Sequence, residues 1–117
     1  MSENISWILQ VAIYPGKLDD FRALAGDLIL ATQSEPGTLT YEWNLSDDST
    51  ICHIYERYQN AEALLNHLHS FGPYAERFMQ CCCPTRFHVY GTPTDAVKGA
   101  LADFNPVYFL PMGGFSR

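Results

Sequence analysis

Glu35-Pro36-Gly37-Thr38-Leu39-Thr40-Tyr41-Glu42-Trp43-Asn44-Leu45 is the stretch that decides how this chain folds. A residue before proline avoids the helical conformation and glycine favours a turn, so the first three residues end one element. Beyond them, large apolar side chains alternate with polar ones, which is the two-residue period of a half-buried strand. The stretch therefore predicts a turn and then a strand over residues 39–45.

The residues before this turn predict a strand followed by a helix. From residue 17 to about residue 34 the apolar positions recur in steps of three and four, as in an amphipathic helix. These positions are Leu18, Phe21, Leu24, Ala25, Leu28, Ile29 and Thr32. Pro15-Gly16 separates this helix from residues 5–14, where apolar residues occupy both faces of an alternating pattern, as in a central strand.

The residues after residue 45 predict two more strands and a second, interrupted helix. Residues 46–49 have hairpin-loop chemistry and residues 51–58 form the antiparallel partner strand. Asn60 is placed to cap a helix that has a buried apolar stripe. Gly72-Pro73 interrupts this helix. The stripe is Ala61, Leu64, Leu68 and Phe71, and a second helical piece carries Tyr74, Ala75, Phe78 and Met79. This piece is expected to end near the cysteine run and Pro84, with a fourth strand over residues 86–90.

This order of elements, β-α-β-β-α-β, predicts an α+β, ferredoxin-like fold with a four-stranded antiparallel sheet in the order 4-1-3-2. Two helices then cover one face of the sheet and leave the other bare. A chain that is 47% apolar and 17% charged has more apolar surface than so small a domain hides alone. We therefore expect a homodimer that pairs through the bare face.

The chain is expected to divide into a domain over residues 1–90 and a C-terminal extension over residues 91–117. Thr92-Pro93 is placed to start a helix over residues 95–104, and Asn105-Pro106 ends it. The apolar residues 107–110 follow as the strand of this helix/strand extension and need a docking surface. That surface is either the chain's own domain or a partner subunit.

Charge and hydropathy exclude several classes of partner. The formal net charge is −6 and the seven Lys and Arg residues are scattered, which disfavours a nucleic-acid surface. No apolar run approaches the roughly 20 residues that span a bilayer, and the first residues lack the basic segment of a secretory signal. A cytoplasmic protein that binds neither nucleic acid nor membrane is the expectation.

The four cysteines are Cys52, Cys81, Cys82 and Cys83. Their spacing matches neither a zinc site nor a disulfide framework. We interpret them as reduced thiols, most of them small buried apolar side chains.

Several motifs in order resemble those of the antibiotic biosynthesis monooxygenase (ABM) family. Residues 35–41 resemble the family's glutamate-proline-glycine-small-leucine-x-tyrosine signature. Residues 55–58, residues 61–64 and His67 resemble its strand ending, helix start and helix histidine. With Tyr14-Pro15-Gly16-Lys17, the likeness covers residues 5–90.

The resemblance implies a dimeric α/β barrel with a pocket between helices and sheet in each subunit. Its characterised relatives include oxygenases that act on phenolic, quinol or anthrone-like rings without a cofactor, and enzymes that degrade haem. In the haem-degrading branch, an asparagine of the first strand acts together with a tryptophan and a histidine of a helix. Here the nearest polar residue in the first strand is Gln10, and the second helix has no tryptophan. We therefore expect no cofactor.

His67 is the candidate catalytic base. Oxygenation without a cofactor needs a base, a dry pocket and hydrogen bonds to the resulting oxyanion, and histidine titrates near neutral pH. His67 follows Leu64 by three residues and so lies on the flank of the buried stripe, whereas His69 faces the opposite side. Residues two apart on a helix diverge, so these two histidines cannot share a metal ion, and none is expected. A structural histidine bonded to the backbone is the alternative.

Aromatic side chains are the candidate substrate-binding walls. They are Trp7, Tyr41, Trp43, Tyr74 and Phe78. Aromatic walls stack on flat rings, but the same residues also suit core or interface packing. For Glu56 we favour a structural salt bridge or a bond to the backbone over proton transfer. For Arg57 and Arg86, substrate orientation and surface ion pairs are both open.

Three functions follow from these features. The first is a cofactor-independent monooxygenase that acts with O₂ on a small aromatic, quinol or polyketide-like ring. The second is a non-catalytic dimeric ligand-binding or stress-related protein, which needs the cavity but no base. The third is a small isomerase or cyclase that transfers protons without O₂.

Overall fold

The computed structural model describes residues 3–117 as one α+β unit built on a single open sheet. The strands are β1 (Ile5–Ile13), β2 (Thr38–Leu45), β3 (Ile51–Tyr58), β4 (Cys82–Tyr90) and β5 (Val107–Phe109). Their order across the sheet is β2-β3-β1-β4-β5. The first four strands pair antiparallel, which confirms the ferredoxin-like order predicted from the sequence.

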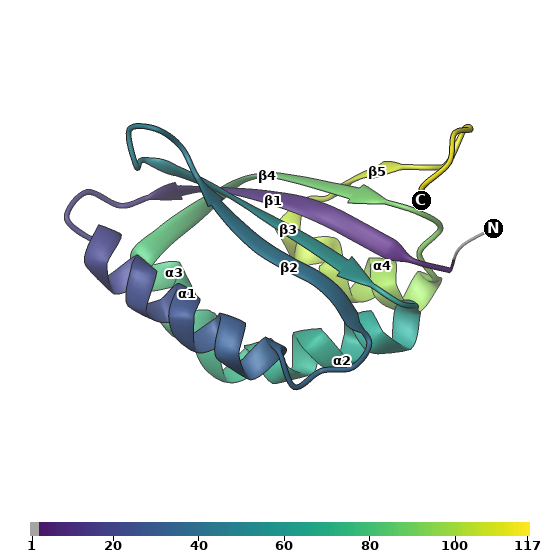
Figure 1. Cartoon of the computed structure of the whole chain (residues 1–117), viewed down its shortest axis with the longest axis horizontal. Helices are drawn as coiled ribbons and strands as arrows, with labels where there is room; N and C mark the ends of the chain where they lie inside the picture. Colours follow the sequence, from purple (N-terminus) through teal and green to yellow (C-terminus); the bar gives the residue numbers. More distant parts are fainter. Residues whose placement is uncertain (1–2) are drawn as a thin grey trace.

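All the helices lie on the same side of the sheet (Figure 1). They are α1 (Leu18–Thr32), α2 (Ala61–Phe71), α3 (Ala75–Cys81) and α4 (Asp95–Leu101), with short 3₁₀ turns η1 (Gly72–Tyr74) and η2 (Ala102–Phe104). Asn60 caps α2 as predicted, because its side chain accepts a hydrogen bond from the backbone of Ala63. Within residues 3–117, no helix has the length and apolarity needed to cross a bilayer.

The sheet is larger than predicted, because the strand of the C-terminal extension, β5, joins it as a fifth strand. Strand β5 pairs parallel with β4, so the sheet is mixed. The sheet of one chain is open and does not close into a barrel. Strand β5 has three residues. So short a strand shows no alternating pattern from which the neighbouring strand in the sheet could be predicted.

Strand β4 also begins earlier than predicted. The sequence places its start at Arg86, after Pro84, whereas the strand starts at Cys82 and runs through the proline. Proline lacks a backbone N–H and is tolerated in a strand where the ladder is irregular. The register between β1 and β4 shifts between Gln10 and Val11, next to Pro84, and this irregularity accommodates it.

The side chains between sheet and helices form two clusters. One packs α1 and α3 on the sheet, and its buried members are Val11, Phe21, Leu24, Leu28, Cys52, Ile54, Phe78, Cys81 and Cys82. The other packs α2 and α4 on the opposite end, with Ile5, Trp7, Tyr58, Leu64, Phe87, Val89, Val97 and Leu101.

The uncovered face of the sheet is more polar than the sequence pattern suggests. Gln10 of β1 donates a hydrogen bond to Thr85 of β4 (3.0 Å) and lies 2.8 Å from the ring of His53 of β3. A row of polar side chains thus crosses three strands. Ile8 and Ala12 lie beside it on β1, so this face is mixed rather than apolar.

Helix α4 of the C-terminal extension packs on the same side of the sheet as the other helices. Thr94 caps α4 by accepting a hydrogen bond from the backbone of Val97, and the side chains of Val97 and Leu101 are fully buried. Beyond β5 the chain leaves the body of the protein (Figure 1). Leu110, Met112 and Phe115 are exposed there.

Gly37 lies where strand β2 meets helix α2. A Cβ atom at this position would lie 2.5 Å from Cβ of Ala63, so an added methyl group must push the helix away. We expect Gly37→Ala to lower the free energy of unfolding by about 1–3 kcal/mol, as overpacking does. Gly26, inside α1 with open space around it, is the matched control.

Gly26→Ala is expected to raise stability by about 0.5–1 kcal/mol, because alanine loses less backbone entropy in a helix. Urea unfolding of both variants measures the two effects. Equal effects in the two variants would contradict the close approach at Gly37.

Candidate functional site

A cavity of about 130 Å³ lies between the sheet and the helices, where the two core clusters meet. Its lining draws on both clusters and on the exposed rims of α3 and η2. The lining residues are Trp7, Leu9, Tyr41, Trp43, Ile54, Glu56, His67, Leu68, Phe71, Ala75, Phe78, Met79, Pro84, Phe87, Leu101 and Phe104. A dry cavity of about 150 Å³ is known to accept benzene, so this space suits one ring.

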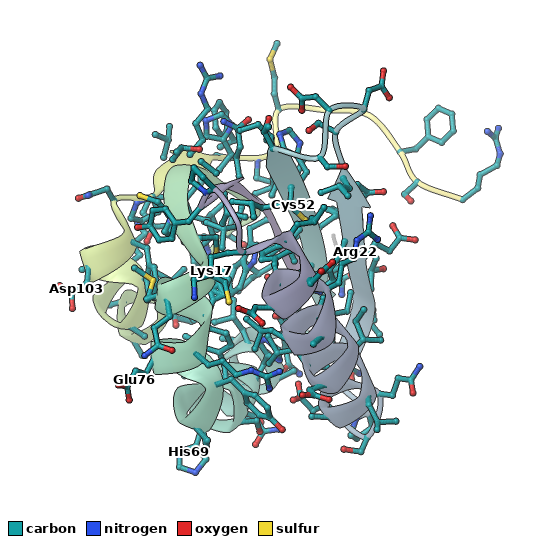
Figure 2. The ribbon with its side chains drawn as sticks, turned by 90° about the vertical axis from the view of Figure 1, so that its left-hand side faces the viewer. Lys17, Arg22, Cys52, His69, Glu76 and Asp103 are labelled. Atoms are coloured by element: carbon teal, nitrogen blue, oxygen red, sulfur yellow. The ribbon has the colours of Figure 1, made fainter. Side chains whose placement is uncertain are left out.

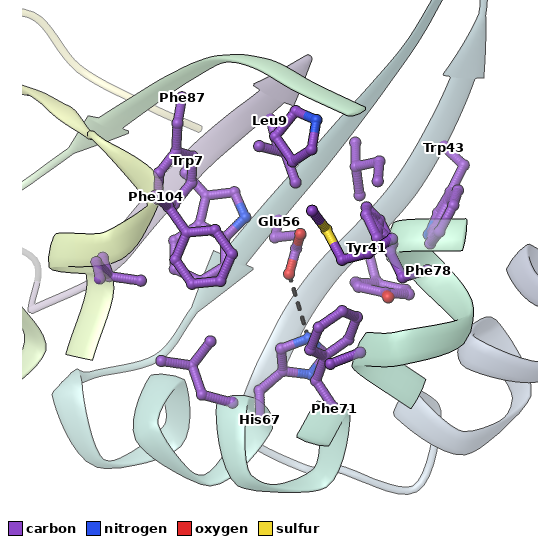
Figure 3. A pocket seen from close by; sticks show the side chains of 16 residues that line it. Trp7, Leu9, Tyr41, Trp43, Glu56, His67, Phe71, Phe78, Phe87 and Phe104 are labelled. Atoms are coloured by element: carbon purple, nitrogen blue, oxygen red, sulfur yellow. Dashed lines mark ion pairs between the residues drawn. The ribbon is translucent and has the colours of Figure 1, made fainter. Parts of the chain in front are cut away.

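The strand register places the polar part of the lining in one row. Glu56 of β3 lies directly opposite Tyr41 of β2 on one side and Trp7 of β1 on the other. Directly opposed residues in a sheet have neighbouring side chains on the same face. The next row, through Ile54 and Leu9, is apolar. Glu56 is therefore an acidic side chain in an otherwise apolar floor (Figure 3).

His67 of α2 lies between two carboxylates. Its Nδ1 is 2.9 Å from Oε1 of Glu35, and its Nε2 is 3.3 Å from Oε1 of Glu56 (Figure 3, dashed line). All three side chains are buried, with exposed fractions of 4% for His67, 9% for Glu35 and 7% for Glu56. Both ring nitrogens are thus occupied, and the carboxylate of Glu56 is the acidic group that faces the cavity.

Neighbouring hydroxyl groups hold the two carboxylates in place. Tyr58 donates a short hydrogen bond to Oε1 of Glu56, and Thr38 donates one of 2.8 Å to Oε1 of Glu35. The bonds from Tyr58 and His67 both end on Oε1 of Glu56, so neither uses Oε2. The rings of Tyr41 and Tyr58 each lie 5.3 Å from the ring of His67, which fixes the imidazole from both sides.

The electrostatics of this group favour a charged imidazole. Burial opposes the charge, but the hydrogen bonds and negative charges of Glu56 and Glu35 outweigh it and raise the pKa of His67 above 6.5. Burial and the nearby Glu56 raise the pKa of Tyr58 well above 10, so its hydroxyl remains a donor. The protonated imidazole places one positive charge between the two carboxyl groups.

The raised pKa of His67 predicts a pH dependence of stability. Because the pKa is higher in the folded state, the stabilisation is complete below the unfolded value of about 6.5 and is lost as pH rises through the folded value. We expect the difference in unfolding free energy between the native chain and His67→Ala to shrink as the pH increases from 6 to 9. Urea unfolding at several pH values measures it. A difference that grows with pH would contradict the charged imidazole.

Most of the predicted site residues meet at this cavity. His67, Trp7, Tyr41, Trp43 and Phe78 all line it. Tyr74 packs against the α1–α3 cluster and is not among the lining residues, and its role in binding stays a prediction. His69 points away from the body of the protein into solvent (Figure 2).

The salt bridge predicted for Glu56 is present, with His67 as its partner, but sequence reasoning missed the partner Glu35 and part of the cavity wall. Glu56 lies on the inward face of β3 with Ile54 and Tyr58. A single acidic residue among apolar residues that alternate along the strand was the signal that could have identified it. Glu35 is 32 residues from His67, and no sequence spacing links them. Leu101 and Phe104 come from the C-terminal extension, whose docking position could not be read from the chain.

The cysteines do not contribute a nucleophile to the cavity. Burial raises the pKa of Cys52 to about 11 and that of Cys82 to about 12, so both are thiols at neutral pH. All four cysteines are free, and three of them are buried, as the sequence predicts. Among residues 3–117, no group of three or more His, Cys, Asp or Glu side chains is arranged to hold a metal ion.

Comparison with known proteins gives a family match and several similar structures. The sequence model of the family described as "Antibiotic biosynthesis monooxygenase" matches residues 5–80. The crystal structure of MupZ from Pseudomonas fluorescens is similar over 99% of this chain and 96% of its own, with a TM-score of 0.90 and 28% identity. No curated protein matches the sequence.

Two oxygenase-related structures share the fold at lower identity. A putative antibiotic biosynthesis monooxygenase from Caulobacter crescentus has a TM-score of 0.68 and 20% identity, over 75% of this chain and 88% of its own. SnoaB, a cofactor-independent oxygenase from Streptomyces nogalater, has a TM-score of 0.68 and 10% identity, over 80% of this chain and 96% of its own.

Proposed function

The chain belongs to the antibiotic biosynthesis monooxygenase family, and from this premise we propose that it is an enzyme that removes a proton from a small, largely apolar ring substrate and thereby starts monooxygenation by O₂. The observation that carries the proposal is the carboxylate of Glu56, buried on an apolar cavity floor and hydrogen-bonded to His67. General acid–base groups work best when they are positioned in a water-poor site.

In this reaction Glu56 accepts the substrate proton, and His67 and Glu35 act as positioning residues. The substrate is an aromatic, quinol or polyketide-like ring that becomes electron-rich once deprotonated, so it can pass electrons to O₂ without metal or flavin. One oxygen atom enters the ring, and the substrate supplies the two electrons that reduce the other atom to water. The apolar walls exclude bulk water from the reacting ring.

A second candidate, a cyclase or isomerase that uses no O₂, is favoured by the presence of a single carboxylate in an otherwise apolar cavity. Glu56 can take a proton from one atom of a bound substrate and return it to another, and this transfer needs no oxidant. Ring closure or isomerisation of a polyketide-like hydroxyl compound fits this pattern.

Oxygen dependence separates these functions. The purified protein is tested with anthrone, naphthalene-1,4-diol and small hydroxyketones, with and without O₂, and His69→Ala serves as the matched control for His67→Ala. Oxygen uptake that accompanies product formation supports the monooxygenase, and turnover undiminished under nitrogen supports the cyclase or isomerase. Saturable binding without turnover would overturn both and support the non-catalytic ligand-binding function.

We propose that the protein acts as a homodimer, as members of this family typically do. The C-terminal tail supports this, because Leu110, Met112 and Phe115 are exposed and such apolar clusters normally pack on a partner. The uncovered sheet face and the tail would then both lie against the second copy.

Sedimentation velocity tests the assembly. The native chain is expected to sediment as a dimer at micromolar concentration. The double variant Met112→Ser/Phe115→Ser is expected to raise the dimer dissociation constant roughly 100-fold, because two large apolar side chains lose their burial. A monomeric native chain would contradict the proposal.

We also propose a cytoplasmic location. The four unpaired cysteines support it, because thiols persist in reducing compartments.

A further inference from the structure

The indole N–H of Trp7 is a buried donor that no group in the described part of the chain accepts. Trp7 is 3% exposed, and its Nε1 has no hydrogen-bond partner. Leaving a buried polar group unpaired costs about 1–3 kcal/mol, so such groups are rare in folded proteins. A phenylalanine would supply most of the same apolar packing without this cost. Within residues 3–117, Nε1 of Trp43 and the hydroxyl of Tyr108 are also buried without a partner, but of these three donors only that of Trp7 belongs to a cavity residue directly opposite Glu56.

The ring of Trp7 is held in a fixed orientation. The rings of Tyr58 and Phe87 each lie 5.1 Å from it, at steep angles of 54° and 74°. Trp7 lines the cavity, and its indole nitrogen is turned toward the side where Glu56 lies (Figure 3). A donor fixed in this way has lost its conformational entropy before a ligand arrives.

Trp7 and Glu56 are also directly opposed on neighbouring strands. One side chain donates a hydrogen bond and the other accepts one, and the surrounding lining is almost wholly apolar. A ligand that satisfies both groups must carry an acceptor oxygen next to a proton-donating group.

We infer that Trp7 Nε1–H binds an acceptor oxygen of the substrate, a ring carbonyl or ether, while Glu56 takes the proton of a hydroxyl or activated C–H on the same molecule. This inference rests on the proposed function and narrows its substrate class to oxygenated rings with that pair of groups. Trp7 is then a specificity-determining residue, because an analogue without the oxygen leaves the indole N–H unpaired.

The isosteric ligands cyclohexanone and methylenecyclohexane test this inference without turnover. The chain has two tryptophans, so ¹H–¹⁵N spectra of the full-length protein contain two indole signals, and Trp7→Phe assigns them. Cyclohexanone is expected to move the Trp7 indole proton downfield in a saturable manner. Methylenecyclohexane is expected to leave it near its free position while shifting the methyl signal of Met79, which also lines the cavity.

Binding affinities provide the second readout. Trp7→Phe is expected to weaken cyclohexanone binding about 10-fold, the value of one hydrogen bond, and to leave methylenecyclohexane binding nearly unchanged. Phe78→Leu is the matched control, since Phe78 lines the same cavity and carries no hydrogen-bond donor. It is expected to affect both ligands equally.

Equal indole shifts with the two ligands, or no Trp7 shift up to the solubility limit of cyclohexanone, would overturn the inference. Neither result bears on proton transfer by Glu56, which the oxygen-dependence assay and Glu56→Gln test separately. A failed activity assay likewise leaves the spectroscopic result standing.

Discussion

Glu56→Gln is expected to lower kcat by about 100- to 10,000-fold, the usual contribution of a general acid–base group. The amide keeps the size of the carboxylate and still accepts hydrogen bonds from Tyr58 and His67, so the fold should persist. It cannot accept the substrate proton. Steady-state kinetics on the substrate found in the oxygen-dependence screen measures the loss, and circular dichroism checks the fold.

Two further carboxylate variants test whether the loss of kcat is specific to Glu56. Glu35→Gln also removes a carboxylate from His67, but Glu35 does not line the cavity, so a smaller loss of about 10-fold is expected. Glu76→Gln lies on the exposed surface of α3 and should leave kcat unchanged (Figure 2). If Glu35→Gln proved more damaging than Glu56→Gln, Glu56 would not be the group that meets the substrate.

His67→Ala is expected to lower the free energy of unfolding by about 3–5 kcal/mol at pH 6.5. The substitution removes the positive partner of two buried carboxylates and leaves them uncompensated, which is the costly way to break a buried ion pair. His69→Ala, two residues along the same helix but exposed, should change stability by no more than about 0.5 kcal/mol. Urea unfolding measures both.

His67→Gln provides a second measurement if His67→Ala does not fold. Its amide donates one hydrogen bond to a carboxylate, so an intermediate loss of stability is expected. If His67→Ala and His67→Gln both unfolded at the same urea concentration as the native chain, the imidazole of His67 would contribute nothing to stability through the two buried carboxylates.

The parts of the fold that follow from local periodicity could be predicted from the sequence. The alternation through Tyr41 and Trp43 and the three- and four-residue steps of α1 and α2 gave the correct elements in the correct order. The same spacing placed His67 toward the sheet and His69 toward water. These predictions held because burial imposes a regular period on each amphipathic element.

Features that depend on contacts between distant segments could not be predicted. Strand β4 continues through Pro84 because of a register shift against β1, which is a property of two strands and not of one. The pairing of Glu35 with His67 depends on how the turn after α1 meets α2. The position of the C-terminal extension beside β4 likewise follows from packing, which no local pattern encodes.

The cavity wall draws on two parts of the chain. The proposed acid–base group lies on β3, α2 and the turn at Glu35, all within residues 5–80, which the family model matches, whereas Leu101 and Phe104 lie beyond them. Phe104 is 40% exposed, so changes there would alter the ring sizes admitted at little expense to stability. Evolution, or an engineer, could thus retune selectivity through the appendage and leave the reaction chemistry intact.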